Sequence, residues 1–257
     1  MTMPSIDIET FTWSNLQSDV FQYRHANAML LYLKRVANPA LDAVDAEHEK
    51  MSRSDEPAAV FQVNDMAVLR ESTTQAFTLS VQSLWERQLR EYLKECAREL
   101  KYDVSFVGKL EMAKWADLLK YFQKLRGVPL QDFDSYPYLD LLQMIGNACR
   151  HGDGVSARKL YERRSDLWPN WPPRILPDWL GASLHNVNNV PLFSQIRLPR
   201  SLLEQLTQAV IWFWEDHRYI YTNSIACKHP SIVGALAKMR EERARRKWPG
   251  KCVGQFK

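Results

Sequence analysis

The stretch SYPYLDLLQMIGNACRHGDG, residues 135–154, carries the clearest fold signal in this 257-residue chain. Its apolar residues recur every three or four positions, so they share one face of a helix. Asp134 or Ser135 is a candidate N-cap, and Gly152 follows the pattern where helices commonly end in a left-handed residue. The stretch therefore predicts an amphipathic helix with defined ends.

The same helical spacing recurs along most of the chain, whereas strand-like alternation is scarce. Only nine glycines are present, so tight turns between strands should be few. We therefore expect an all-α protein. The first helix should end before Pro39, and ESTTQ at 71–75 should bend or break the second. Helices are predicted over residues 14–37, 58–101, 109–126, 135–151, 155–168 and 201–225, and again from Pro230 onward.

These patterns divide the chain into three regions. Residues 1–57 are expected to form an N-terminal helical extension that ends in a polar linker. Residues 58–228 should form a helical bundle, and residues 229–257 a basic C-terminal helix or tail.

An irregular insertion is expected within the bundle, at 169–199, because this segment holds six of the thirteen prolines. Its aromatic residues Trp171, Trp179 and Phe193 argue against disorder. Two roles are open for it, a lid over a site or a docking surface for a partner. Its tryptophans could equally be ordinary core residues.

The formal net charge of +4 is small, but basic residues concentrate near the end of the chain. Seven of them lie between Lys238 and Lys251, against two glutamates. This run is either a solvated terminal helix or a tail that contacts nucleic-acid phosphates. In the second case Trp248 is available for base stacking, and the phosphate contacts would come from Arg243, Arg245, Arg246 and Lys247.

Several classes of protein are not supported by the sequence. The N-terminus lacks the pattern of a signal peptide, and the longest apolar run, at 209–214, is too short for a membrane span. The four cysteines show no paired spacing, so we expect a cytoplasmic protein with no membrane partner. Phosphate-loop, dinucleotide and metal-ligand motifs are absent, which predicts no cofactor and no metal. His25 and His217 are expected at helix surfaces or boundaries.

Polar residues cluster in the last turn of the helix in 135–154. Asn147 and His151 are four residues apart and share a face. The helix dipole favours a protonated histidine there, by about 0.3–1 kcal/mol. His151 could therefore be only a cation that satisfies the last carbonyl groups, or it could be part of a reactive site.

The sequence IGNACRHG resembles the signature of the HEPN superfamily, in which a helix carries an arginine, a polar residue, three variable residues, a histidine and often a glycine. Asn147, His151 and Gly152 match the last conserved positions. The predicted helix over 58–101, which contains Glu86, also looks like the one that packs antiparallel to the motif helix in that family. The resemblance covers roughly residues 60–225.

The resemblance implies a HEPN-like helical bundle and a metal-independent endoribonuclease of toxin–antitoxin or antiphage systems. It also implies RNA as substrate, a homodimer with the active site at its two-fold axis, and an antitoxin or defence-system partner protein. His151 would be the general acid/base and Asn147 would orient substrate or histidine. Glu86 would either tune His151 or form an ion pair at the edge of the core.

One position departs from the signature, because Gly146 stands where the family has its arginine. Arg150 lies one turn later on nearly the same face, and its side chain should lean back over Gly146. Arg150 could therefore replace the phosphate-binding arginine, or it could be a plain last-turn cation. The alternative for the whole chain is a catalytically inactive HEPN-like module for dimerisation or partner binding. A glycine inside a helix also predicts a close approach by a backbone at a dimer axis or by a bound phosphate.

Overall fold

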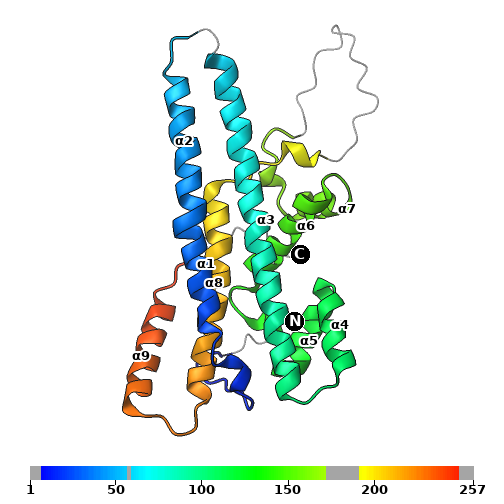
Figure 1. Ribbon diagram of the computed structural model, residues 1–257, viewed down its shortest axis with the longest axis vertical. Helices are drawn as coiled ribbons and strands as arrows, with labels where there is room; N and C mark the ends of the chain where they lie inside the picture. The colour runs from blue at the N-terminus through cyan, green and yellow to red at the C-terminus, as the bar shows by residue number, and fades with distance from the viewer. Residues whose placement is uncertain (1–6, 57–58, 172–190, 249–257) are drawn as a thin grey trace.

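The computed structural model describes residues 7–56, 59–171 and 191–248. Helices and no strands are found there, so the expected all-α class is confirmed. Figure 1 shows two long helices, α3 and α8, with α2 beside the first half of α3 and α4 to α7 along its other side. The elements are α1 (Tyr23–Tyr32), α2 (Asn38–Ser52), α3 (Ala59–Glu99), α4 (Val104–Met112), α5 (Trp115–Arg126), α6 (Tyr136–His151), α7 (Val155–Arg163), α8 (Arg200–Ser224) and α9 (Pro230–Ala244).

The N-terminal helix differs from the prediction at both ends. It begins at Tyr23 rather than near residue 14, and a short 3-10 turn at Gln17–Asp19 precedes it. It also does not stop before Pro39, because a π-helical turn at Leu33–Ala37 joins α1 directly to α2. Pro39 then lies in the first turn of α2, directly after the π-helical turn. The two helices pack against α8 and α3 respectively.

The segment ESTTQ does not interrupt α3, so the expected break is wrong. The hydroxyl group of Thr74 donates to the Arg70 carbonyl oxygen at 2.9 Å, and that of Thr78 donates to the Thr74 carbonyl at 2.8 Å. Both threonines thus satisfy their hydroxyls on the carbonyl one turn earlier, and the helix continues through them.

The predicted helix over 109–126 is two helices, because the backbone is extended at Ala113 and Lys114. Arg90 of α3 stabilises this break. Its guanidinium donates to the carbonyl oxygens of Leu110 at 2.9 Å and Ala113 at 2.7 Å. An arginine from a neighbouring helix therefore satisfies carbonyls that the end of α4 leaves without intrahelical partners.

The core forms where α3 crosses α8. The rings of Trp85 and Phe213 meet edge to face at 4.8 Å between centroids, and those of Tyr92 and Trp214 at 5.8 Å. All four side chains are essentially inaccessible to solvent. Aromatic pairs of this geometry stabilise a core by about 0.5–1.5 kcal/mol beyond their buried area.

The two ends of the expected insertion are joined to each other. The indole N–H of Trp168 donates to the Leu192 carbonyl oxygen at 2.9 Å, and the backbone N–H of Arg197 donates to that of Leu167 at 2.7 Å. Trp171 packs against the core. Trp179 lies outside the described residues.

The basic C-terminal helix begins at Pro230, as the sequence predicts, and Figure 1 shows α9 returning beside α8. Among the helices described, none combines the length and the apolar character that crossing a bilayer requires.

Candidate functional site

The end of α6 packs against the middle of α3, with the two helices antiparallel. Arg150 lies beside Gln82, whereas Gln143, two turns earlier on α6, lies beside Glu86, one turn later on α3. The antiparallel pairing that the resemblance implied is therefore present between these two segments.

Gly146 allows this close approach. A Cβ atom at this position would lie 2.6 Å from Cγ and 2.9 Å from Cδ of Gln82, which is shorter than real contacts permit. The glycine is thus explained by a side chain of the same chain, not by a dimer axis or a phosphate as the sequence suggested. An arginine at position 146 would meet the same atoms.

The amide of Gln82 is the centre of a buried polar network. Its Nε2 donates to Glu86 Oε2 at 2.6 Å and to Gln143 Oε1 at 2.6 Å. Both N–H groups of the amide are therefore used, and the remaining oxygen faces Arg150 and accepts a hydrogen bond from its Nη2. The network fixes the orientation of the Gln82 amide and thereby the position of the arginine.

Arg150 is an exposed residue with a constrained guanidinium. Besides Gln82, its Nη2 contacts Ser83 Oγ at 3.3 Å, and its Nη1 contacts Asn147 Oδ1 at 3.5 Å. The Arg150 side chain reaches Gln82, the residue that packs on Gly146. This direction was predicted, because side chains on a helix tilt toward its N-terminus. These three contacts leave the Nε–H and one Nη1–H for a ligand, out of the five N–H groups that an arginine has.

His151 is exposed on the turn that carries Arg150 and Asn147. Its ring makes no hydrogen bond within the described part of the chain. The backbone N–H of Gly152 closes the helix on the Ala148 carbonyl at 2.9 Å, and Gly152 has φ +61°, which favours glycine. The imidazole is therefore accessible to a substrate and is not needed to cap α6.

Glu86 forms an ion pair at the edge of the core, which is one of the two roles expected for it. Its Oε1 lies 2.5 Å from Nη2 of Arg90, and no contact joins it to His151 among the described residues. Burial favours the neutral acid, but the hydrogen bond and charge of Arg90 outweigh burial and hold the pKa of Glu86 below its usual value. Glu86 thus acts on the site only through Gln82.

The basic residues of the C-terminal helix divide into two groups. Arg243 and Arg246 approach Asp216, a fully buried residue of α8, at 3.3 Å and 2.5 Å. Arg245 pairs on the surface with Glu241 at 3.4 Å, and Lys247 is exposed. Two of the four predicted phosphate contacts therefore stabilise a buried carboxylate.

Trp248 is similarly engaged, because its ring stacks on Tyr138 at 5.1 Å between centroids and meets the Trp212 ring at 4.5 Å. The tryptophan expected to be available for base stacking is half-buried, with its ring packed against these two aromatic side chains.

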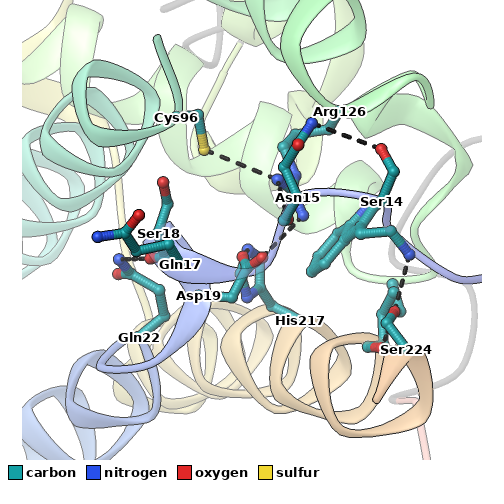
Figure 2. A network of polar contacts seen from close by, with 12 residues as sticks. Ser14, Asn15, Gln17, Ser18, Asp19, Gln22, Cys96, Arg126, His217 and Ser224 are labelled. Atoms are coloured by element: carbon teal, nitrogen blue, oxygen red, sulfur yellow. Dashed lines mark hydrogen bonds and ion pairs between the residues drawn. The ribbon is translucent and has the colours of Figure 1, made fainter. Parts of the chain in front are cut away.

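A second polar cluster lies deep in the molecule, where Asp19, Arg126 and His217 meet (Figure 2). Asp19 Oδ2 accepts a hydrogen bond from Arg126 Nη2 at 2.9 Å, and Asp19 Oδ1 accepts one from the Tyr92 hydroxyl at 2.9 Å. The side chains of Asp19 and His217 are 0% exposed and that of Arg126 is 2% exposed. No substrate can reach these groups, so the cluster is structural. It holds the N-terminal segment against α3, α5 and α8.

His217 belongs to this buried cluster, so its expected position at a helix surface or boundary is wrong. Its Nε2 lies 3.1 Å from Asp19 Oδ1, but neither ring nitrogen makes an aligned hydrogen bond. Burial, followed by the charge of Arg126, holds the pKa of His217 well below its usual value. His25 is half-buried, as a boundary residue should be.

No motif in the sequence pointed to the residues that hold the site together, which are Gln82, Ser83, Arg90 and Gln143. Their helix positions contained a partial signal. Residues 82, 86 and 90 follow one another at intervals of four and so share one face of α3. With Gly146 marking a close approach, this polar stripe was the best candidate for the opposing surface.

Replacing Gly146 with alanine tests the contact with Gln82. Alanine is about 1 kcal/mol better than glycine inside a helix, but overpacking costs about 1–3 kcal/mol, and the fixed Gln82 side chain leaves little room to adjust. We expect the cost to outweigh the gain, so that Gly146→Ala lowers the free energy of unfolding by up to about 2 kcal/mol in urea denaturation. The control is Gly234→Ala on α9, where no atom lies within 4 Å of the added Cβ. That variant should gain about 0.5–1 kcal/mol, and equal gains for both variants would contradict the prediction.

The exposed end of α6 is therefore the candidate site, with His151 accessible and Arg150 oriented by α3. Among the described residues, no group of three or more His, Cys, Asp or Glu side chains could hold a metal ion. No protein-family model, curated protein or solved structure matches this chain.

Proposed function

We propose that this protein is a HEPN-like, metal-independent endoribonuclease that acts on cytoplasmic RNA as a toxin or antiphage effector. The observation that supports the proposal is the pairing of two features on one helical turn. His151 is exposed and bonded to none of the described residues. The Arg150 guanidinium beside it is held by Gln82, and two of its N–H groups bond to none of the described residues. RNA can be cleaved by attack of a ribose 2′-hydroxyl on the adjacent phosphodiester of the same strand. A proton acceptor and a fixed phosphate-binding cation are the minimum that this reaction requires.

In this reaction His151 accepts the proton of the ribose 2′-hydroxyl, and the 2′-oxygen attacks the adjacent phosphorus. The bond between phosphorus and the 5′-oxygen breaks as the new bond forms. The leaving oxygen takes a proton from an imidazolium, and the products carry a 2′,3′-cyclic phosphate and a 5′-hydroxyl. Arg150 stabilises the charge that builds on the phosphoryl oxygens.

A homodimer is part of the proposal, with the α6 ends of two copies facing each other as the resemblance implies. Each site would then hold two imidazoles, so one could accept the first proton while the other donates the second. Asn147, which contacts Arg150 at 3.5 Å, would orient the cation or the substrate.

The direct test is incubation of the purified protein with total RNA in the presence of EDTA, followed by mapping of the cleaved ends. We expect 2′,3′-cyclic phosphate ends and a loss of about 100-fold or more in cleavage rate for Arg150→Ala, because one fixed charge donor is removed from the transition state. The matched control is Arg98→Ala, an exposed arginine of α3 about 24 Å along the helix axis from Gln82. Undiminished cleavage by Arg150→Ala would rule out its role as the phosphate clamp.

The alternative function is a non-catalytic HEPN-like module that binds a partner protein, such as an antitoxin or a defence-system component. One observation favours it. Val60 and Phe61 are neighbours at the start of α3 and are 74% and 75% exposed, and adjacent exposed apolar side chains offer a surface that a partner could cover. Two results together would support this alternative. The wild-type protein would leave RNA intact, and the Phe61→Glu variant would differ from the wild type in its state of association in analytical ultracentrifugation.

A further inference from the structure

A cleft of about 590 Å³ opens immediately after the candidate catalytic turn. Gly152 and Asp153, which follow His151, form part of its wall. α3 supplies polar side chains to the opposite wall, and the segment before α8 supplies Phe193 and Arg197. The volume lies within the range of about 300–1,000 Å³ that is usual for small-molecule sites.

The walls of the cleft are held in place by hydrogen bonds. Asp153 Oδ1 accepts from the backbone N–H of Phe193 at 2.5 Å, and Glu71 Oε1 accepts from that of Leu198 at 2.7 Å. Each carboxylate of the cleft therefore has one oxygen that accepts a hydrogen bond from a backbone N–H. The segment that carries Phe193 and Arg197 is fixed before any ligand arrives, which reduces the entropy lost on binding.

The lining of the cleft suits an unpaired nucleotide. Arg197 is exposed, and the one hydrogen bond of its guanidinium to a described residue is to the carbonyl of its neighbour Ile196, at 3.2 Å. Phe193 offers a half-buried aromatic face, and Asn64 and Gln75 offer amides. Proteins recognise unpaired bases by stacking on aromatic rings and by hydrogen bonds to base edges, and they bind phosphates with arginine.

The cleft is also in line with the candidate site. Arg150 contacts α3 at Gln82, and the nearest α3 residue of the cleft is Gln75, about 10 Å away along the helix axis. A second cleft of about 510 Å³ shares Glu71 and Arg197 with the first, so the groove continues past the cleft. A strand with its phosphate at Arg150 could therefore follow α3 into the cleft.

We propose that this cleft binds one unpaired nucleotide of single-stranded RNA next to the cleaved phosphodiester. The base stacks on Phe193, its edge meets the amides of Asn64 and Gln75, and Arg197 holds the neighbouring phosphate. The site makes the enzyme selective for single strands and gives it a preference at one flanking base. This inference rests on the proposed function, because that function supplies the RNA strand.

Binding is tested separately from cleavage, in the His151→Ala background, by fluorescence anisotropy with a labelled twelve-nucleotide single-stranded RNA. Removal of a stacked base contact by Phe193→Ala, or of the cation by Arg197→Ala, should each weaken binding about tenfold. Phe193→Tyr keeps an aromatic face and should restore most of the affinity, which separates stacking from a folding defect. Arg98→Ala is the matched arginine control, and a duplex of the same sequence should bind more weakly.

The outcomes of this test and of the cleavage test are distinct. Unchanged affinity in both Phe193→Ala and Arg197→Ala would overturn the cleft as a nucleotide site, even if wild-type protein cleaves RNA. Conversely, the wild-type protein could cleave no RNA while both variants bind RNA more weakly than their parent. That result would overturn the proposed function and support the nucleotide site.

Discussion

Replacing His151 with alanine should abolish RNA cleavage, with a fall in rate of about 100-fold to 10,000-fold. The histidine is the side chain in the exposed turn of α6 that can serve as a general acid or base. Because its ring makes no hydrogen bond to the described residues and does not cap α6, its removal should leave the fold intact. We therefore expect the same thermal unfolding midpoint for His151→Ala and wild type, within about 1–2 °C.

The matched control is His48→Ala, which removes a partly exposed histidine of α2. This variant should cleave RNA at the wild-type rate. The same pair can be used in cells, where expression of the wild type and His48→Ala should arrest growth and expression of His151→Ala should not. Cleavage by His151→Ala at the wild-type rate would end the proposal that this imidazole moves the proton.

The helix that carries the site could be predicted from local sequence, because its signals lie within twenty residues. Apolar spacing located α6, and Gly152 marked its end. Asn147 and His151 fall on one helical face through their interval of four. The direction of the Arg150 side chain also followed from helix geometry alone. Each of these inferences needs only the residues of one element.

The partner of Gly146 could not be predicted in the same way. The glycine indicated a close approach, but the sequence did not show which element approaches. The contact with Gln82 depends on how α3 and α6 are packed, and these residues are 64 positions apart in the chain. A single sequence therefore suggested a dimer axis or a phosphate, when an intramolecular amide fills the space.

The buried cluster was missed for the same reason. Asp19 and Arg126 are separated by 107 residues and look like ordinary surface charges in their local patterns. Arg126 sits in the last turn of α5, where a basic residue is expected for reasons of helix dipole alone. Only the docking of the N-terminal segment onto the bundle removes these charges from solvent.

Replacing Arg126 with methionine should lower the free energy of unfolding by about 3–5 kcal/mol, the largest stability effect expected in this protein. Methionine keeps much of the volume of the arginine but leaves the Asp19 carboxylate buried without its cation. It also removes a 3.2 Å hydrogen bond to the Asn15 carbonyl and a guanidinium that lies 3.9 Å from the centre of the Trp13 ring. The measurement is urea denaturation followed by circular dichroism. Arg53→Met, at an exposed pair with Glu49, should change stability by less than about 0.5 kcal/mol.

The deficit of Arg126→Met should grow with pH. Burial raises the pKa of Asp19 from 3.8 to about 6 in the folded protein, while Arg126 acts to lower it. A carboxyl group with a raised folded pKa stabilises the fold fully below the unfolded pKa, and this contribution is lost as pH rises through the folded pKa. Without Arg126 the pKa of Asp19 in the folded protein rises further. The stability lost when Asp19 ionises is then spread over a wider pH range, and its total at high pH is larger. Unfolding at pH 5 and pH 8 should therefore show the smaller deficit at pH 5, where Asp19 can be neutral.

Replacing both residues, as Asp19→Leu with Arg126→Met, should recover part of the loss, because an apolar pair leaves no buried charge unpaired. A deficit that is the same at both pH values, and is not recovered in the double variant, would mean that the packing of Arg126 rather than its charge holds the N-terminal segment in place.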